Sequence, residues 1–206
     1  MMDNPITSWR AETRRKLLAA RLALDTATLE HWRVAIDELL ERVFPDLAQG
    51  VLAMYWPIRK EYDPRPLVTR LQARGLRACM PGPVASDAPM HFRVWHPGIE
   101  MVTDALGIAT PVGTPEIVPQ TILVPLVGWD DAGYRLGYGG GYFDRTLAAI
   151  EPPALAIGVG YEQSRLSTIQ PQPWDQPLDY IVTERAAYRR VNGRLDTVLE
   201  RPARAN

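Results

Sequence analysis

A glycine-rich segment is the clearest chemical feature of the sequence. Four glycines lie within five positions: Gly137, Gly139, Gly140 and Gly141. They follow an apolar run, residues 121–127, which is typical of a buried strand, and they precede residues 143–150, which favour a helix. A strand that leads through glycines into a helix can bind phosphate there, because free N–H groups and the positive end of the helix dipole both face the anion.

The spacing of these glycines fits neither of two well-known phosphate-binding motifs. A Walker A loop needs a Lys followed by Ser or Thr, and the dinucleotide fingerprint needs Gly-x-Gly-x-x-Gly. The order here is Gly137-x-Gly139-Gly140-Gly141. Taken alone, the segment leaves two interpretations open: a phosphate loop, or a structural turn in which glycine adopts positive φ.

Composition excludes several classes of protein. Hydrophobic residues make up 46% of the 206 positions and the net charge is −1, so neither nucleic acid nor a membrane is expected as a partner. No run approaches the ~20 apolar residues of a membrane span, and residues 1–8 lack the apolar core of a signal peptide. Cys79, the single cysteine, is expected as a reduced core thiol. We therefore expect a cytoplasmic monomer with one domain over residues 1–206.

The order of the expected elements predicts an α/β fold. Helices are expected over residues 7–24, 26–43, 64–74 and 143–150. Strands are expected over residues 51–56, 76–80, 90–95, 121–127, 154–161 and 178–183, and residues 97–120 are expected to be mostly loop. Strands that alternate with helices indicate a three-layer α/β/α sandwich with a largely parallel central sheet.

Two local signals mark the two ends of this fold. Asp25 is expected to cap the second of two N-terminal helices, which form a helical pair. Near the other end, Asn192-Gly193 separates residues 188–191 from residues 194–199. An Asn-Gly pair between two strand-like segments predicts a C-terminal hairpin.

Residues 131–145 resemble the signature of the 5-formyltetrahydrofolate cyclo-ligase family, also called methenyltetrahydrofolate synthetases. The end of that signature, Arg-Leu-Gly-x-Gly-Gly-Gly-Tyr-Tyr-Asp-Arg, is similar to residues 135–145, which differ in having Phe143 for the second Tyr. Weaker similarities follow in the same order over roughly residues 10–185: Tyr55-Trp56-Pro57 with Glu61, Gly107 to Pro111, and Leu178 to Glu184.

The resemblance implies an ATP-dependent reaction on a folate. In this family ATP phosphorylates the formyl oxygen of 5-formyltetrahydrofolate. The folate nitrogen N10 then attacks the activated carbon, phosphate leaves, and 5,10-methenyltetrahydrofolate forms. The implied partners are ATP and 5-formyltetrahydrofolate, and the implied cofactor is Mg²⁺, which accompanies the nucleotide. The family fold is a three-layer α/β/α sandwich, in agreement with the order of elements.

The resemblance also implies roles for individual residues. The implied ATP-binding residues are Arg10, Arg14, Arg135, Gly137, Tyr138, Gly139, Gly140, Gly141, Tyr142, Asp144 and Asp175. The implied folate-binding residues are Trp56, Glu61, Met90 and Tyr142, with Trp95 as a further candidate for packing against the pterin. Arg14, Arg135 and Asp144 are the implied catalytic residues. Asp144 is also the implied Mg²⁺ ligand, since a hard oxygen suits that ion.

Three of these charged residues have a structural alternative. Asp144 could serve only to compensate the helix dipole. Arg135 could form a loop salt bridge with Asp130 or Asp131, and Glu61 could be an ordinary surface charge.

The basic residues near the N-terminus also have two interpretations. Arg10, Arg14 and Arg21 share one face of the expected helix with Leu17. Such a face is either a solvated stripe or a binding surface for the phosphates of the nucleotide.

Two departures from the family pattern support a second hypothesis for the function. Arg10 stands where the family usually has Lys, and Trp174 stands where it commonly has His, just before the acidic position Asp175. Arg differs from Lys in reach and geometry. The alternative is a diverged family member that binds nucleotide without cyclo-ligase activity. A third hypothesis, a sugar-phosphate isomerase, is supported by fold analogy alone.

Overall fold

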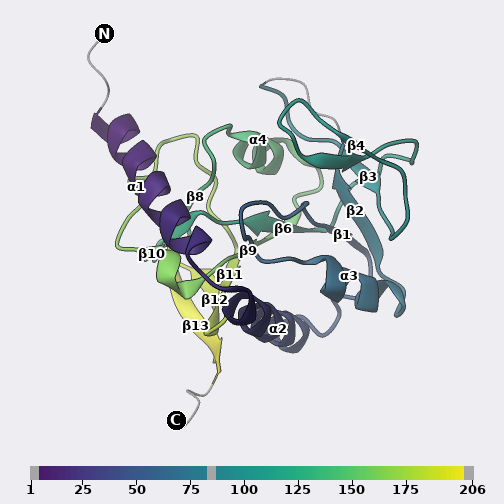
Figure 1. The fold of residues 1–206 in the computed structure, drawn as a ribbon, viewed down its shortest axis with the longest axis horizontal. Coiled ribbons are helices and arrows are strands. Elements are labelled where there is room, and N and C mark those ends of the chain that lie inside the picture. The colour runs from purple at the N-terminus through teal and green to yellow at the C-terminus, as the bar shows by residue number, and fades with distance from the viewer. Residues whose placement is uncertain (1–4, 83–86, 202–206) are drawn as a thin grey trace.

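An eight-stranded sheet forms the centre of the fold (Figure 1). The structure, a computed structural model, describes residues 5–82 and 87–201. The strands of this sheet are β1 (Val51–Ala53), β2 (Arg77–Pro81), β3 (Phe92–Val94), β6 (Thr121–Pro125), β9 (Leu155–Val159), β11 (Tyr180–Val182), β12 (Ala186–Val191) and β13 (Arg194–Glu200). Their order across the sheet is β13-β12-β11-β9-β6-β1-β2-β3.

The middle of this sheet is parallel. Strands β11, β9, β6, β1 and β2 run in one direction. Antiparallel pairing adds β12 and β13 at one edge and β3 at the other. The predicted α/β fold with a largely parallel central sheet is therefore confirmed.

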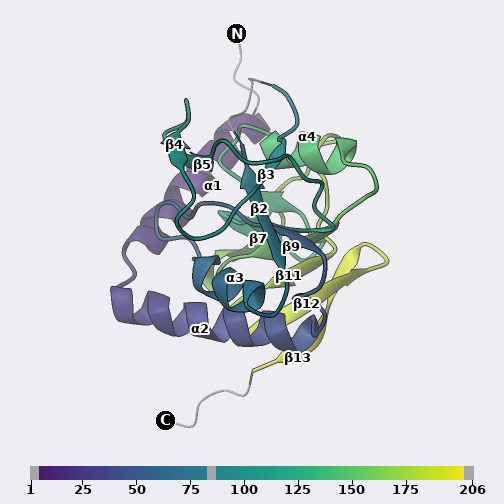
Figure 2. The same cartoon turned by 90° about the vertical axis from the view of Figure 1, so that its right-hand side faces the viewer.

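Helices cover both faces of the sheet. The helices α2 (Thr26–Val43) and α3 (Arg65–Gln72) lie on one face, and α4 (Tyr142–Ala149) lies on the other (Figures 1 and 2). Successive strand residues point to opposite faces. Leu123 accordingly packs in the core on the α2 and α3 side, whereas Ile122 and Val124 pack in the core on the α4 side. This arrangement is the predicted three-layer sandwich.

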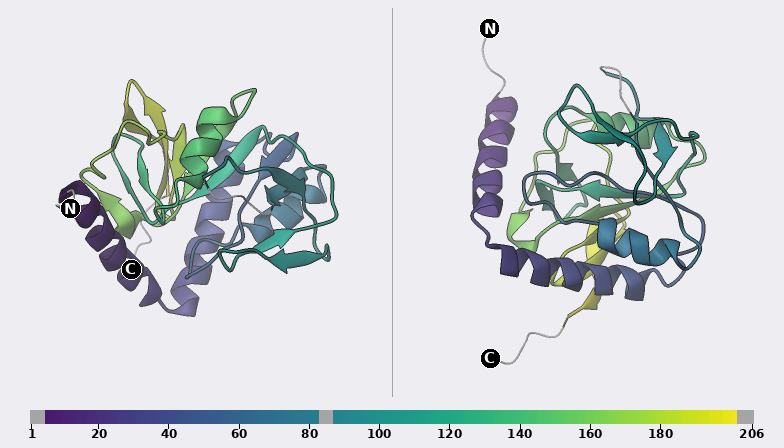
Figure 3. Two further views of the ribbon diagram at one scale, coloured as in Figure 1. Left: turned by 90° about the horizontal axis from the view of Figure 1, so that it is seen from above. Right: turned by 45° about the vertical axis from the view of Figure 1, so that its right-hand side comes forward.

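The N-terminal helical pair is also confirmed. Helix α1 (Pro5–Leu22) meets α2 at a steep angle rather than lying along it (Figure 3). Asp25 caps α2, because its Oδ1 accepts a hydrogen bond of 2.7 Å from the Thr28 N–H. This turn directs α1 toward the opposite side of the molecule from α3.

Helix α1 packs closely on a second, smaller sheet. This sheet contains β7 (Gly128–Asp130), β8 (Arg135–Leu136) and β10 (Arg165–Leu166). A Cβ at Gly128 would lie 2.6 Å from the Leu17 Cδ1 on α1. The missing side chain at this position therefore lets the helix approach the sheet.

Three segments contain strands that the sequence pattern does not predict, and one of them is the short β10. The expected loop at residues 97–120 contains an antiparallel hairpin of β4 (Met101–Thr103) and β5 (Ala109–Pro111). The polar segment after β6 forms the β7–β8 pair around a buried Asp130. The Asp130 Oδ1 accepts hydrogen bonds from two N–H groups of the turn, and its Oδ2 accepts one from the Ile169 N–H. Asp130 is therefore buried, although the polar sequence of this segment is typical of an exposed turn.

The remaining local predictions agree with the structure. The turn at Asn192-Gly193 joins β12 to β13 with positive φ at both positions, 49° and 81°, as the predicted hairpin requires. Cys79 is a buried free thiol, and burial raises its pKa to about 12. Within the described ranges, no helix is long and apolar enough to cross a membrane.

The close packing of α1 is open to a direct test. Gly128→Ala should lower the free energy of unfolding by about 1–3 kcal/mol, because the added methyl group overlaps the Leu17 side chain. The double variant Gly128→Ala/Leu17→Ala should lose less than the sum of the two single variants, since the shorter side chain frees the space. Urea denaturation followed by circular dichroism measures all three losses. Strict additivity would show that this contact does not limit the approach of α1.

Candidate functional site

A cavity of about 450 Å³ lies at the carboxyl ends of β1 and β6. These neighbouring strands mark a switch in topology, since β1 continues through α3 to β2 on one side and β6 continues through α4 to β9 on the other. Open α/β sheets bind ligands in the crevice at such a point. Except for Trp95, all the residues to which the resemblance assigns ATP or folate line this cavity: Arg10, Arg14, Trp56, Glu61, Met90, Arg135, Gly137, Tyr138, Gly139, Gly140, Gly141, Tyr142, Asp144 and Asp175.

The glycine loop leaves its main chain open to this cavity. Gly141, at the N-cap of α4, has a φ of 67° and offers no side chain to cap the helix. Gly139 has a φ of 100°. A Cβ at Gly137 would meet no atom within 4 Å. Gly141 and Tyr142, at the start of α4, line the cavity, and a helix N-terminus without a side-chain cap suits an anion.

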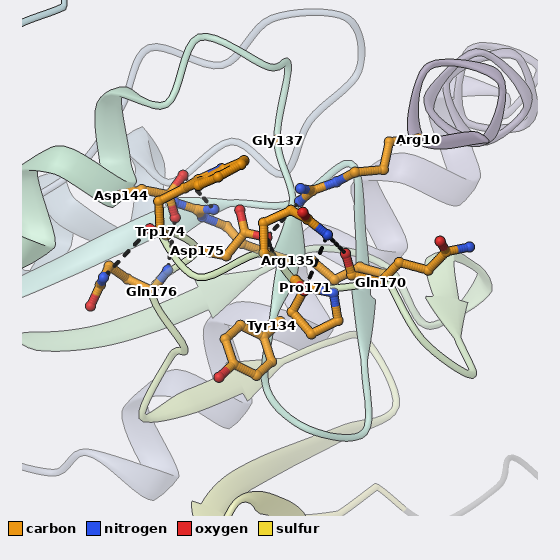
Figure 4. Close-up of polar contacts among 12 residues, drawn as sticks. Arg10, Tyr134, Arg135, Gly137, Asp144, Gln170, Pro171, Trp174, Asp175 and Gln176 are labelled. Atoms are coloured by element: carbon orange, nitrogen blue, oxygen red, sulfur yellow. Dashed lines mark hydrogen bonds and ion pairs between the residues drawn. The ribbon is translucent and has the colours of Figure 1, made fainter. Parts of the chain in front are cut away.

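Two arginines of α1 reach this end of the cavity. The Arg14 Nε–H donates a hydrogen bond of 2.8 Å to the Gly137 carbonyl oxygen. The Arg10 guanidinium pairs with the Asp175 Oδ2 at 2.9 Å (Figure 4). Burial, and then the charge of Arg10, lower the pKa of Arg14. The negative charge of a bound anion would favour the charged form of Arg14 and so oppose this shift.

The face of α1 that carries these residues is not a solvated stripe. Arg10 and Arg21 are both buried, and Arg14 is partly buried. The Arg21 guanidinium donates hydrogen bonds to the Leu126 carbonyl oxygen at 2.9 Å and to the Tyr138 hydroxyl at 2.6 Å. This face of α1 therefore forms a wall of the site.

Arg135 pairs with Asp144 across the glycine loop. Its Nη2 lies 3.0 Å from the Asp144 Oδ1, which also accepts a hydrogen bond of 3.0 Å from the Gln176 N–H (Figure 4). The alternative of a salt bridge between Arg135 and Asp130 or Asp131 is wrong. Asp130 accepts main-chain N–H groups, and Asp131 pairs with an arginine of β10 at 2.7 Å.

Glu61 is a buried carboxylate, so the surface-charge alternative is wrong for it. Its side chain is 3% exposed, with the Arg21 Nη2 at 3.8 Å from Oε1. The Ile58 N–H donates to Oε2 at 2.9 Å, and the Tyr138 hydroxyl donates to Oε1 at 3.0 Å. Burial raises the pKa of Glu61, while the Ile58 and Tyr138 hydrogen bonds and the Arg21 charge oppose the shift.

Three residues singled out in the sequence have surroundings that the sequence did not predict. Trp95 is buried in the core on the α2 and α3 side and does not line the cavity, so the expectation that it packs against the pterin is not supported. The Tyr138 hydroxyl, on the loop assigned to ATP, contacts Glu61 instead. Trp174, which replaces the usual His, is 66% exposed and lines the cavity beside Asp175.

Sequence reasoning missed one wall of the cavity. The β4–β5 hairpin contributes Leu106, Ile108 and Thr110 to the lining. The similarity over Gly107 to Pro111 was a signal for this wall, but the types of these residues suggest no chemistry. Arg59 was also missed, although it lines the cavity and its Cζ lies 5.3 Å from the centre of the Tyr138 ring.

A metal ion in this cavity would need ligands beyond the carboxylates of the described residues. Among the described residues, no group of three or more His, Cys, Asp or Glu side chains is arranged to hold an ion. Mg²⁺ at phosphate sites usually takes one or two carboxylates and completes its shell with water and substrate oxygens. Asp144, which lines the cavity beside the glycine loop, offers such a carboxylate.

Comparison with known proteins gives the family. The sequence model of the 5-formyltetrahydrofolate cyclo-ligase family matches residues 6–184. The chain belongs to this family. It is therefore an enzyme of a ligase family, and both its glycine loop and its cavity fall within the matched residues.

Relatives cover most of the chain. The 5-formyltetrahydrofolate cyclo-ligase of Escherichia coli (strain K12) is 29% identical over 147 residues, which cover 68% of this chain and 80% of that protein. The one from Mycoplasma pneumoniae is 29% identical over 173 residues, 83% of this chain and 96% of that protein. The NMR structure of Aquifex aeolicus 5,10-methenyltetrahydrofolate synthetase matches with a TM-score of 0.77 and 28% identity, over 90% of this chain and 94% of that one.

The burial of Glu61 leads to a testable prediction about its pKa. Its pKa should lie above the ordinary value of a glutamate, because burial disfavours the carboxylate. Arg21→Met should raise the pKa further, since the variant removes a positive charge that favours the ionised form. Carboxyl ¹³C shifts followed against pH measure both effects. The exposed Glu12 is the control, because Lys16 lowers its pKa; a Glu61 midpoint at or below the ordinary value would contradict the prediction.

Proposed function

We propose that this protein converts 5-formyltetrahydrofolate to 5,10-methenyltetrahydrofolate with hydrolysis of ATP to ADP and phosphate, through phosphorylation of the formyl oxygen. The observation that carries the proposal is one cavity with two chemically different ends. At one end an uncapped helix N-terminus lies beside Arg10 and Arg135, each paired with an aspartate, and beside Arg14; at the other end lies the buried carboxylate of Glu61, which accepts hydrogen bonds from Ile58 and Tyr138. Membership of the family supports the same reaction.

In this proposal the glycine-loop end holds the phosphates of ATP. The N–H groups at the start of α4 are free of any side-chain cap, and small residues allow phosphate oxygens to approach the main chain. Arg10 and Arg14 would contact the phosphates from α1. Arg135 lies beside the loop and can hold phosphoryl oxygens with two N–H groups at once.

The other end suits a pterin. A carboxylate can accept two hydrogen bonds from the aminopyrimidine edge of the pterin. Among the described residues, the Ile58 N–H donates to one Glu61 oxygen and the Tyr138 hydroxyl donates to the other, so each oxygen can accept a further hydrogen bond. Trp56 and Met90 supply apolar surface to the same cavity. These contacts would place the folate with its formyl group toward the glycine loop.

Positioning and charge neutralisation then account for the chemistry. Bringing the formyl oxygen and the transferred phosphoryl group together lowers the entropic cost of reaction. Arg14 and Arg135 would stabilise the negative charge that spreads over the phosphoryl oxygens during transfer. Mg²⁺ held by Asp144, when bound, would neutralise part of the same charge.

The proposed activity predicts a signal in a direct assay. Purified protein with Mg·ATP and 5-formyltetrahydrofolate should develop the absorbance band of the methenyl product, and the control without ATP should not. No growth of the band, with ATP binding confirmed on the same sample, would instead support a nucleotide-binding relative without this activity. Arg10→Lys and Trp174→His would then be the variants in which to look for recovered activity.

The role of Asp144 predicts a specific loss. Asp144→Asn should lower kcat on the order of 10²–10³-fold, because it removes the proposed metal ligand and the charge that holds Arg135. The Kd for 5-formyltetrahydrofolate should stay within about twofold, since Glu61 is unchanged. Asp131→Asn is the matched control, because its exposed carboxylate pairs outside the cavity. Near-normal turnover of folded Asp144→Asn would exclude the assignment.

A further inference from the structure

Tyr138 joins the two ends of the cavity. It belongs to the glycine loop, yet its hydroxyl lies 3.0 Å from the Glu61 Oε1 and 2.6 Å from the Arg21 Nη2. The ring lines the cavity, and the Arg59 guanidinium lies over it at 5.3 Å. One side chain of the loop thus contacts the carboxylate at the opposite end.

The direction of these hydrogen bonds follows from the chemistry of the groups. A guanidinium only donates, so the Tyr138 oxygen accepts from Arg21. The hydroxyl hydrogen is then free to point to Glu61, which as a carboxylate only accepts. The phenol therefore orients the carboxylate and has no further hydrogen to offer a phosphate.

Side chains from outside the loop hold it in place, and one of them, Arg145 of α4, donates a hydrogen bond of 2.9 Å to the Gly140 carbonyl oxygen. From residue 137 to residue 141, position 138 is the only one that is not glycine. Glycine has the widest conformational freedom, so the loop gains little rigidity from its own sequence. On one side the loop is tied to Arg14 through the Gly137 carbonyl oxygen. On the other side the Tyr138 hydroxyl ties it to Glu61.

We propose that Tyr138 is a positioning residue that couples binding of the folate to binding of the nucleotide. The inference rests on the proposed function, in which Glu61 holds the pterin and the glycine loop holds phosphate. Phosphate on the loop fixes Tyr138 and so orients Glu61 for the folate. Folate on Glu61 fixes Tyr138 and so orders the loop for phosphate. By linkage, each ligand tightens the other by the same factor.

Calorimetry on the full chain tests this coupling. The Kd of 5-formyltetrahydrofolate is measured with and without Mg²⁺ and the non-hydrolysable β,γ-imido analogue of ATP. In the wild-type protein the analogue should tighten folate binding by about tenfold, within the usual range for coupled sites. Tyr138→Phe keeps the ring and removes the hydroxyl, so this factor should fall to within about twofold of one.

The reverse titration and a matched variant complete the experiment. The Kd of the analogue with and without folate should give the same factor in each protein, as linkage requires. Tyr180→Phe is the control, since Tyr180 lies on β11 outside the cavity and its variant should keep the wild-type factor. A merely structural role for Tyr138 would lower stability or weaken each ligand alone without changing the factor.

The outcomes separate this inference from the proposed function. If the wild-type protein binds neither folate nor the analogue, the proposed function fails. If both bind and Tyr138→Phe keeps the wild-type factor, the coupling role of Tyr138 is overturned while the proposed function stands. Binding of both ligands to the wild-type protein with no coupling between them overturns the inference in the same way.

Discussion

A loop built almost entirely of glycine cannot hold its own shape, and the site depends on how other elements hold it. The same lack of side chains that opens the main chain to an anion removes the contacts that normally fix a loop. Arg14 supplies one contact from α1, and Tyr138 supplies another to Glu61. Helix α1, which carries Arg14, also packs closely on the small sheet at Gly128, where a Cβ would lie 2.6 Å from the Leu17 Cδ1.

Two of the cavity's arginines are paired with aspartates, and a third, Arg14, is not. A buried charge is costly unless it is paired, and Arg10 and Arg135 each have an aspartate partner. Arg14 differs from them, since its hydrogen bond goes to a neutral carbonyl group and no carboxylate of the described residues lies within ion-pair distance of it. The cavity thus keeps a cation beside the open N–H groups of α4, where an anionic ligand would find both.

Strong local signals made much of the fold predictable. An Asp before a helical pattern and an Asn-Gly pair between two strands each fix a local geometry by themselves, and both Asp25 and Asn192 act as predicted. The short strands β7 and β8 carry no such signal, because two or three residues are too few to show a period. Their pairing depends on Asp130, whose main-chain partner Ile169 is 39 residues away.

The sequence by itself determined the order of helices and strands, the residue types available for chemistry and the family signature that groups them. Only the tertiary structure decided which charged groups meet. Arg10 and Asp175 are 165 residues apart in the chain, and Glu61 and Tyr138 are 77 apart. No local pattern records such pairs, because they form only when the parallel sheet brings its loops to one edge. The same packing buried Glu61, for which the sequence also left a surface charge open, and placed Trp95 outside the cavity.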